Sequence, residues 1–269
     1  MPPHDQHGAD VRFDWGLRGL ESLLAGGVRT VVIVDVLRFT TAVDVACGRG
    51  AAVTPYPADD AAGAAEEAAR RDALVIGPVA GGDTSLPSLS PVSLRNLTSA
   101  DHILLPSPNG ATVAARAADA GVVVLAGCLR NAAAVAEAVS AFPVGVVAAG
   151  ERWPDGSLRV AVEDAWGAGA LVRTLSPPEA NDPTAGLFAM FGDALGGPQP
   201  ATTGRSRSLS PEAAWTAANL PNDLPSILPK TASGRELEEA GWSLDIEVAA
   251  ALNVSRTVPR LDPEGTFRP

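Results

Sequence analysis

The chain has 269 residues, of which 46% are hydrophobic, enough for one large α/β domain or two smaller ones. Acidic residues outnumber basic residues by 31 to 20, which gives a formal net charge of −11. This charge argues against general affinity for nucleic acids or anionic membranes, and an anionic substrate would need a local cationic pocket or a metal. No apolar run is long enough to span a bilayer, and no secretory signal precedes the first strand, so we expect a cytoplasmic protein.

The first strong signal is an apolar run that ends in polar residues. Residues 31–34 read Val-Val-Ile-Val, a pattern typical of a strand buried on both faces in a parallel sheet. Asp35, Arg38, Thr40 and Thr41 follow directly. Ligands of open α/β sheets bind at the carboxyl ends of such strands, where a carboxylate can hold a divalent cation and a guanidinium can hold phosphate. The alternative is that Arg38 pairs with Asp35 and Thr40 caps a helix.

Further strands alternate with Ala-rich stretches of helical period, which predicts βαβ units and a mostly parallel sheet. The expected strands lie at 52–54, 74–76, 103–105, 122–126 and 144–149, and the expected helices at 59–71, 111–120 and 131–140. We predict a three-layer α/β/α domain over residues 28–258, with an N-terminal extension (1–27) and a C-terminal tail (259–269).

Other stretches have different patterns. Residues 82–99 are rich in Ser, Pro and Leu and predict a long loop of the kind that is often functional. Residues 187–195 have a helical pattern, and Pro211 suits a helix that starts near Ser210. Residues 231–252 predict two helices separated near Gly241, and the C-terminal third is expected to pack on the sheet.

Two strand–turn–helix junctions offer candidate binding residues. At the first, Ser107 and the Asn109-Gly110 pair form a tight turn whose backbone amides can bind an anion, although Pro-Asn-Gly is foremost a turn sequence. At the second, Asn131 either caps the following helix or points into a site, and capping is the better interpretation from this segment alone.

An acidic pair follows the expected strand at 144–149. Glu151 and Arg152 come at the strand end, and after a turn the chain reaches Glu163 and Asp164. Adjacent helical residues diverge by about 100°, so only a position at the helix start lets both acids face one site. The alternative is a solvated pair that favours a helix N-terminus.

Several enzyme classes are excluded as leading hypotheses. The chain has no dinucleotide-binding glycine motif, no P-loop and no Gly-x-Ser-x-Gly elbow. Its three histidines have no metal-ligand or triad spacing, and its two cysteines, Cys47 and Cys128, are far apart.

Taken in order, these segments resemble the 2-phosphosulfolactate phosphatase family. The likeness extends over nearly the whole chain from about Val31. It rests on DVLRFTT (35–41), SPNG (107–110), GCLRNAAAVA (127–136), AGERWPDGSLRVAVEDAWGAGA (149–170), and SGREL with a following D-x-E (233–247).

The resemblance implies a Mg²⁺-dependent α/β phosphatase that converts 2-phosphosulfolactate and water to sulfolactate and phosphate on a route to coenzyme M. By this likeness the partner is a small anionic phosphoester, and a homodimer is kept as an option. The implied catalytic residues are Asp35, Arg38, Glu163 and Asp164, with Asp35, Glu163 and Asp164 as metal ligands. The implied substrate-binding residues are Thr40, Thr41, Ser107, Asn109, Gly110 and Asn131.

One loop departs from the family pattern. Where the family usually has Gly-Glu-Arg-Gly-Gly, this chain has Gly-Pro-Val-Ala-Gly-Gly at 77–82, so an anion and a phosphate-matching cation are replaced by Pro78, Val79 and Ala80. The alternative hypothesis is therefore a non-catalytic member that binds a small anionic ligand. A third is a changed substrate class with a more apolar pocket wall.

Overall fold

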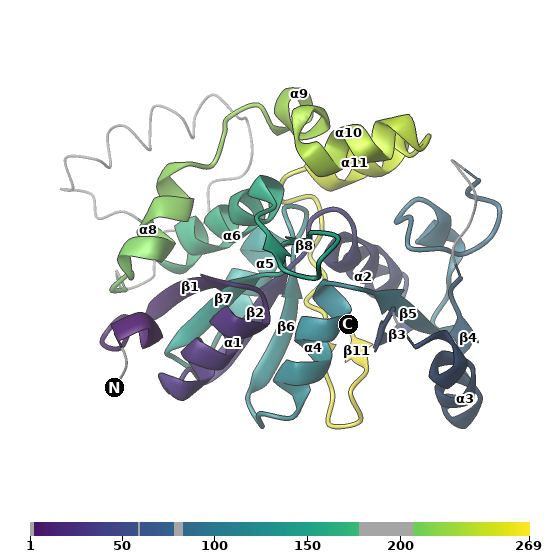
Figure 1. Ribbon diagram of the computed structural model, residues 1–269, viewed down its shortest axis with the longest axis horizontal. Helices are drawn as coiled ribbons and strands as arrows, with labels where there is room; N and C mark the ends of the chain where they lie inside the picture. Colours follow the sequence, from purple (N-terminus) through teal and green to yellow (C-terminus); the bar gives the residue numbers. More distant parts are fainter. Residues whose placement is uncertain (1–2, 59, 78–82, 178–206) are drawn as a thin grey trace.

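The computed structural model describes residues 3–58, 60–77, 83–177 and 207–269 (Figure 1). One large, mostly parallel sheet has the strand order β1-β7-β2-β6-β10-β11-β3-β5-β4. Its strands are β1 (Val11–Trp15), β2 (Thr30–Val34), β3 (Ala52–Pro57), β4 (Leu74–Val75), β5 (His102–Ser107), β6 (Val123–Gly127), β7 (Val144–Ala148), β10 (Arg260–Leu261) and β11 (Phe267–Arg268). A separate antiparallel hairpin is formed by β8 (Glu151–Arg152) and β9 (Leu158–Arg159).

Helices cover both faces of this sheet. They are α1 (Gly16–Ala25), α2 (Phe39–Gly48), α3 (Ala61–Arg71), α4 (Gly110–Ala118), α5 (Ala132–Ala138), α6 (Val162–Leu175), α8 (Pro211–Ala218), α9 (Leu224–Ile227), α10 (Ala232–Glu239) and α11 (Ser243–Ala250), with short 3-10 turns η1 (Pro3–Asp5), η2 (Ser93–Asn96) and η4 (Leu228–Lys230). None of the helices in these ranges is long and apolar enough to cross a membrane.

Strand β2 shows why the sheet is buried on both sides. Its side chains alternate between two cores, as a period of two requires. Val31 and Ile33 pack in the core formed with α1, α2 and α4, whereas Val32 and Val34 pack in the core formed with α5, α6 and α8. The predicted three-layer α/β/α class is confirmed by this arrangement.

The chain ends also contribute strands to the sheet. Residues 11–15 pair in parallel with β7 over five positions, and the β10–β11 hairpin lies between β6 and β3. The ranges 1–27 and 259–269, expected as an extension and a tail, therefore contain strands of the sheet. These strands are short, and their sequence pattern is too weak to predict them.

Most predicted elements of the C-terminal third are present. Ser210 caps α8, whose first residue is Pro211, and α10 and α11 are separated by the turn at Gly241. Figure 1 shows α9, α10 and α11 grouped together beyond the end of the sheet near β8. The predicted helix at 187–195 and the replaced residues at 78–82 lie outside the described residues.

Glycines bring α6 close to the sheet and to α8. A Cβ at Gly167 would lie 2.7 Å from side-chain atoms of Val34 and Val36, and one at Gly169 would lie 2.3 Å from the carbonyl oxygen of Thr216. The close approach at Gly167 places the start of α6 beside the end of β2, which is where the candidate site lies.

Candidate active site

Asp35 lies just beyond the end of β2 and ties two helix starts together. Its Oδ1 accepts a hydrogen bond from the Phe39 amide at 3.0 Å, and its Oδ2 accepts one from the Gly110 amide at 2.9 Å. A Cβ on Gly110 would lie 2.7 Å from Asp35 Oδ2 and 2.4 Å from the Phe39 ring. Only glycine therefore allows α4 to approach so closely.

The two threonines after Asp35 hold the turn rather than present free hydroxyls. Thr40 Oγ1 accepts from the Asp35 amide and donates to the Asp35 carbonyl, and Thr41 Oγ1 donates to the Val36 carbonyl. Both side chains are fully buried. In this structure they position Asp35, and a direct contact with substrate would need these backbone bonds to break.

The acidic pair lies in the first turn of α6, so both acids turn inward. Glu163 is 2% exposed and Asp164 is 3% exposed. Asp164 accepts hydrogen bonds from the amides of Val36 (2.7 Å) and Gly150 (2.9 Å). The Glu163 carboxylate makes no hydrogen bond or ion pair with the residues that the structure describes.

Glu151 joins this group from strand β8. Its Oε2 accepts a hydrogen bond from Asn109 Nδ2 at 2.7 Å, while Asn109 Oδ1 is buried without a hydrogen-bond partner among the described residues. In the sequence, Glu151 is marked only as an acid at a strand end beside Arg152. What identifies Glu151 as a site residue is its hydrogen bond to Asn109, 42 residues earlier in the chain, and no local sequence pattern indicates that contact.

The four carboxylates of the acid cluster, Asp35, Glu151, Glu163 and Asp164, repel one another in a buried setting. Burial, and then the charge of Glu163, raise the pKa of Asp35 to about 6, against the effect of its backbone donors and Arg38. Burial and the charge of Asp35 raise the pKa of Glu151 to about 7. Burial and the charges of Asp35 and Glu163 raise the pKa of Asp164 above its ordinary value. Such perturbed acids are typical of functional sites.

Arg38 pairs with a distant acid, Asp245 of α11, and does not bond Asp35. Its Nη1 lies 2.6 Å from Asp245 Oδ2, and its guanidinium stacks 4.9 Å from the centre of the Trp242 ring. Ser90, in the predicted functional loop, donates to the other oxygen of Asp245. The alternative pairing of Arg38 with Asp35 is wrong, because α11 supplies a carboxylate that the local sequence does not contain.

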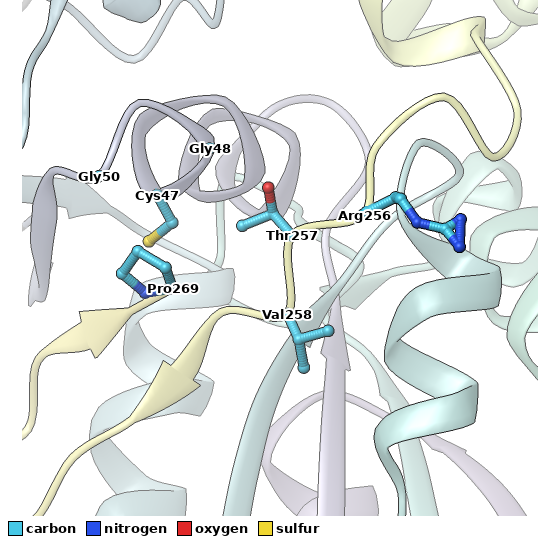
Figure 2. Close-up of a pocket in the computed structure, with 7 residues that line it drawn as sticks. All are labelled: Cys47, Gly48, Gly50, Arg256, Thr257, Val258 and Pro269. Atoms are coloured by element: carbon cyan, nitrogen blue, oxygen red, sulfur yellow. The ribbon is translucent and has the colours of Figure 1, made fainter.

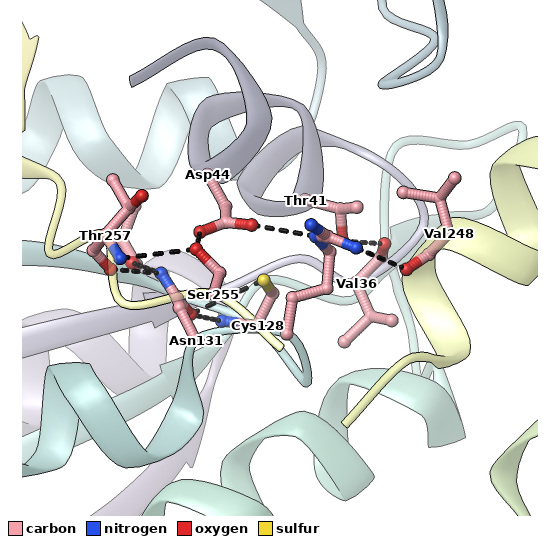
Figure 3. A network of polar contacts seen from close by, with 10 residues as sticks. Val36, Thr41, Asp44, Cys128, Asn131, Val248, Ser255 and Thr257 are labelled. Carbon is pink, nitrogen blue, oxygen red and sulfur yellow. Dashed lines mark hydrogen bonds and ion pairs between the residues drawn. The ribbon is translucent and has the colours of Figure 1, made fainter. Parts of the chain in front are cut away.

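The remaining predicted binding residues divide between two places. Ser107 lies in the Asn109 turn, where its hydroxyl accepts from the Asn109 amide. Asn131 lies elsewhere: its side chain accepts from the Cys128 amide and donates to the carbonyls of Ala126 and Thr257 (Figure 3). Asn131 thus fixes a turn. The amide of Gly110, expected to bind phosphate, already donates to Asp35.

The acid cluster suits a hard cation in its chemistry. Carboxylate and amide oxygens are the ligands of Mg²⁺, which usually takes one or two carboxylates and keeps several waters. Within the described ranges no three His, Cys, Asp or Glu side chains are grouped to hold a metal ion. Glu163, which has no donor among the described residues, and Asp35, whose donors are backbone amides, fit a site of one or two protein ligands and waters, not an all-protein cage.

Two cavities of the described structure bear on the site, and one of them opens onto this cluster. It has a volume of about 320 Å³ and includes Asn109 and Glu151 in its walls. The other, about 550 Å³, lies at the far end of α2 beside Cys47, Arg256 and Pro269 (Figure 2). Burial raises the pKa of Cys47 to about 12, so its thiol stays protonated and offers no nucleophile. The smaller cavity is therefore the candidate active site.

The fold is that of an α/β protein, and its candidate site, a group of buried carboxylates, lies beyond the end of a buried central strand. Comparison with protein families matches residues 21–264 to the model described as 2-phosphosulpholactate phosphatase, so the chain belongs to that family. A search of curated proteins finds no match.

Proposed function

We propose that this protein is a Mg²⁺-dependent phosphatase that hydrolyses a small phosphomonoester to an alcohol and inorganic phosphate. The observation that carries the proposal is the buried acid cluster at the end of β2, in which like charges are held together without an equal number of cations. Holding such charges in a buried site is costly unless a cation binds there. Membership of a phosphatase family supports the choice of reaction.

In this proposal Glu163 and Asp35 hold the metal. A bound Mg²⁺ would supply positive charge to the phosphoryl oxygens and orient water. Asp35 is fixed by the amides of Phe39 and Gly110, so its position is set before any ligand binds. Asp164 accepts hydrogen bonds from the Val36 and Gly150 amides and so holds the start of α6 beside Asp35.

Glu151 is the best-placed residue to move a proton. With a pKa of about 7 it carries a proton for part of the time near neutral pH, which suits a general acid. Its bond to Asn109 fixes the carboxyl at the cavity wall. We propose that Glu151 donates its proton to the leaving alcohol oxygen as the P–O bond breaks and water oxygen bonds to phosphorus. The proton that this water then loses restores the protonated carboxyl group of Glu151.

Arg38 would bind the phosphate after exchanging its partner. Its side chain is 15% exposed and is held by Asp245 and Trp242. A phosphate dianion competes well for a guanidinium, because two parallel hydrogen bonds can form.

The second candidate function is binding without turnover. It is favoured by two observations: the Gly110 amide and Arg38 are both occupied by the protein's own carboxylates, and the 77–82 loop lacks the family's Glu and Arg. A small anionic ligand could then be bound weakly and released unchanged.

A phosphatase assay separates the two functions. Inorganic phosphate release would be measured over a panel of small phosphomonoesters, including 2-phosphosulfolactate, with Mg²⁺ and with EDTA. The Glu163→Gln variant should lose at least 100-fold in activity, whereas Glu137→Gln, an exposed acid on α5, should be unaffected. Glu163→Gln is a cleaner test than Asp35→Asn, whose amide would face a backbone N–H. No release from any ester would contradict catalysis.

A further inference from the structure

Arg159 lies on the β8–β9 hairpin directly opposite Glu151. The two residues are partners in the antiparallel register, so their side chains project from the same face of the hairpin. The base of the hairpin lies against the acid cluster, because the amide of Gly150 donates to Asp164 at 2.9 Å. A Cβ at Gly150 would lie 3.0 Å from the Arg159 carbonyl oxygen, so glycine allows the second strand to lie this close. The hairpin thus brings a guanidinium to the side of the cluster that Glu151 forms.

The Arg159 side chain is mostly buried but loosely held. It is 14% exposed, and its one ion pair within the described ranges joins Nη2 to Glu236 Oε1 of α10 at 3.6 Å. Glu236 is 68% exposed, so this contact lies at the surface and contributes little to stability. The guanidinium lies 5.8 Å from the centre of the Trp153 ring and makes no hydrogen bond to the described residues. Its N–H donors are therefore available to bind an anion.

Arg38 and Arg159 act at different ends of the acid cluster. Burial raises the pKa of both Asp35 and Glu151, and the charge of Arg38 opposes the rise at Asp35, whereas that of Arg159 opposes the rise at Glu151. In the proposed reaction the phosphoryl group lies beside Asp35 and Arg38, and the leaving alcohol lies beside Glu151. A group that Arg159 binds therefore belongs to the alcohol part of the substrate.

An acid group on the alcohol would need a cation at this end of the site. The cluster already holds four carboxylates in a buried setting, and placing another unpaired anion beside them is costly. Mg²⁺ and Arg38 would both be engaged by phosphoryl oxygens. Arg159 can meet the need, because a planar guanidinium forms two parallel hydrogen bonds with the oxygens of one anionic group.

We infer that Arg159 is a specificity-determining residue that binds an acid group, a carboxylate or a sulfonate, on the alcohol part of the substrate. The inference rests on the proposed function, from which it takes the places of the phosphoryl group and the leaving alcohol. To bind the acid group, Arg159 leaves Glu236, whose exposed carboxylate is then solvated. A substrate without the acid group loses this contact and still binds through its phosphoryl group.

Binding of two phosphonates tests the inference without turnover. Calorimetry in the presence of Mg²⁺ would compare phosphonoacetate with ethylphosphonate, which are similar in size and differ in the carboxylate. The wild type should bind phosphonoacetate about tenfold more tightly, as expected for a hydrogen-bonded charged contact. Arg159→Met should abolish this preference and leave the ethylphosphonate affinity unchanged, and Arg159→Lys should keep part of it. Chelation of Mg²⁺ by free phosphonoacetate is the same for every variant, so it cancels in the comparison.

Glu236→Gln should change the preference in the opposite direction without disturbing a buried group. It removes the competing partner of Arg159, so the preference for phosphonoacetate should rise about twofold to threefold. In the Arg159→Met background the same change should have no effect, because the two residues act through one contact. Glu239→Gln, which removes an equal charge from an exposed position on α10, and Arg235→Met, which removes an exposed arginine there, are the controls.

Turnover of phosphoglycolate and ethyl phosphate completes the test. The ratio of their kcat/KM values should favour phosphoglycolate, and Arg159→Met should lower it through a higher KM for phosphoglycolate. A wild type without the phosphonate preference, an equal loss of affinity for both phosphonates in Arg159→Met, or an unchanged preference in Glu236→Gln would overturn the inference, whether or not esters are hydrolysed. A preference that depends on Arg159 without hydrolysis of any ester would contradict the proposed function and leave the assignment of Arg159 supported.

Discussion

Two buried acids, Asp44 within α2 and Asp35 just before that helix, differ in how their charge is balanced. Asp44, one turn and more into the helix, accepts from Arg130 Nε at 2.8 Å and from Ser255 Oγ at 2.6 Å (Figure 3). Asp35, just before the helix, has only backbone amides as donors and faces Glu163. Burial raises the pKa of both acids. Arg130 opposes the rise at Asp44 through a hydrogen bond, whereas Arg38 opposes it at Asp35 by its charge alone.

The difference separates a structural network from a functional one. Arg130 also donates to the Val248 carbonyl, so the Asp44 group links α2, the β6–α5 turn and α11 and leaves its charges paired. The acid cluster around Asp35 links as many elements but leaves negative charge unpaired. Paired buried ions maintain a fold, whereas unpaired ones mark a place where a ligand is to bind.

The largest effect is expected from Gly110→Ala, which changes the contact of α4 with Asp35 and Phe39. The new Cβ would overlap the Phe39 ring and Asp35 Oδ2, so α4 must move away and the Asp35 bond must break. We expect a loss of activity of at least 100-fold and a stability loss of about 2–3 kcal/mol. Gly77→Ala, whose Cβ would meet no atom of the described residues within 4 Å, is the control. Phosphate release and denaturant unfolding measure the two effects, and wild-type values for Gly110→Ala would rule out the described approach of α4.

Breaking the Asp44 network should reduce stability without specific loss of catalysis. Arg130→Met leaves Asp44, which is 1% exposed, as an uncompensated charge, and the expected cost is about 3 kcal/mol. Arg70→Met, which removes an exposed partner of Glu67, should cost much less. Urea unfolding compares the pair. If the activity per folded molecule of Arg130→Met falls as far as that of Glu163→Gln, the division between the two acid groups does not hold.

The opposite change in stability, an increase, is expected when a charge is removed from the acid cluster. Glu163→Gln removes a charge that raises the pKa of Asp35 and Asp164, so the variant should be more stable than the wild type by about 1 kcal/mol at pH 8 without metal. Urea unfolding in EDTA measures this change. A loss of stability at pH 8 would mean that Glu163 contributes favourable interactions to the fold.

A smaller effect is expected in the pH dependence of stability. The pKa of Asp35 is raised to about 6 and that of Glu151 to about 7, so the folded state binds more protons than the unfolded state between about pH 4 and 7. The stability that these two groups contribute is present below their unfolded pKa values and is lost as pH rises through the folded ones. Melting temperatures from pH 5 to 8 in EDTA should fall less in Glu151→Gln than in the wild type. An equal fall in both would show that Glu151 does not titrate in this range.

The sequence predicted the local parts of this arrangement well. The apolar run at 31–34 is a strand buried on both faces, and the acids that follow it and those at 163–164 lie together at its end. Because parallel strands place their carboxyl ends at one edge, such grouping can be expected from chain order alone.

What the sequence did not predict depends on contacts between distant segments. Asp245 binds Arg38 across 207 residues, and Glu151 binds Asn109 across 42. The Gly110 amide, predicted to bind an anion, binds Asp35 because α4 packs against β2. A glycine in a turn has the same local pattern whether its amide faces a ligand or a carboxylate of the protein.

The most direct test of the central claim, that the cluster is held with unpaired negative charge for a cation, is the effect of Mg²⁺ on the melting temperature at pH 8. The wild type should be stabilised by several degrees at millimolar Mg²⁺, with the rise depending on concentration, because the metal binds the folded state. Glu163→Gln should show little rise, and Glu137→Gln should respond like the wild type. A wild type that Mg²⁺ does not stabilise, or a Glu163→Gln variant stabilised equally, would contradict the claim.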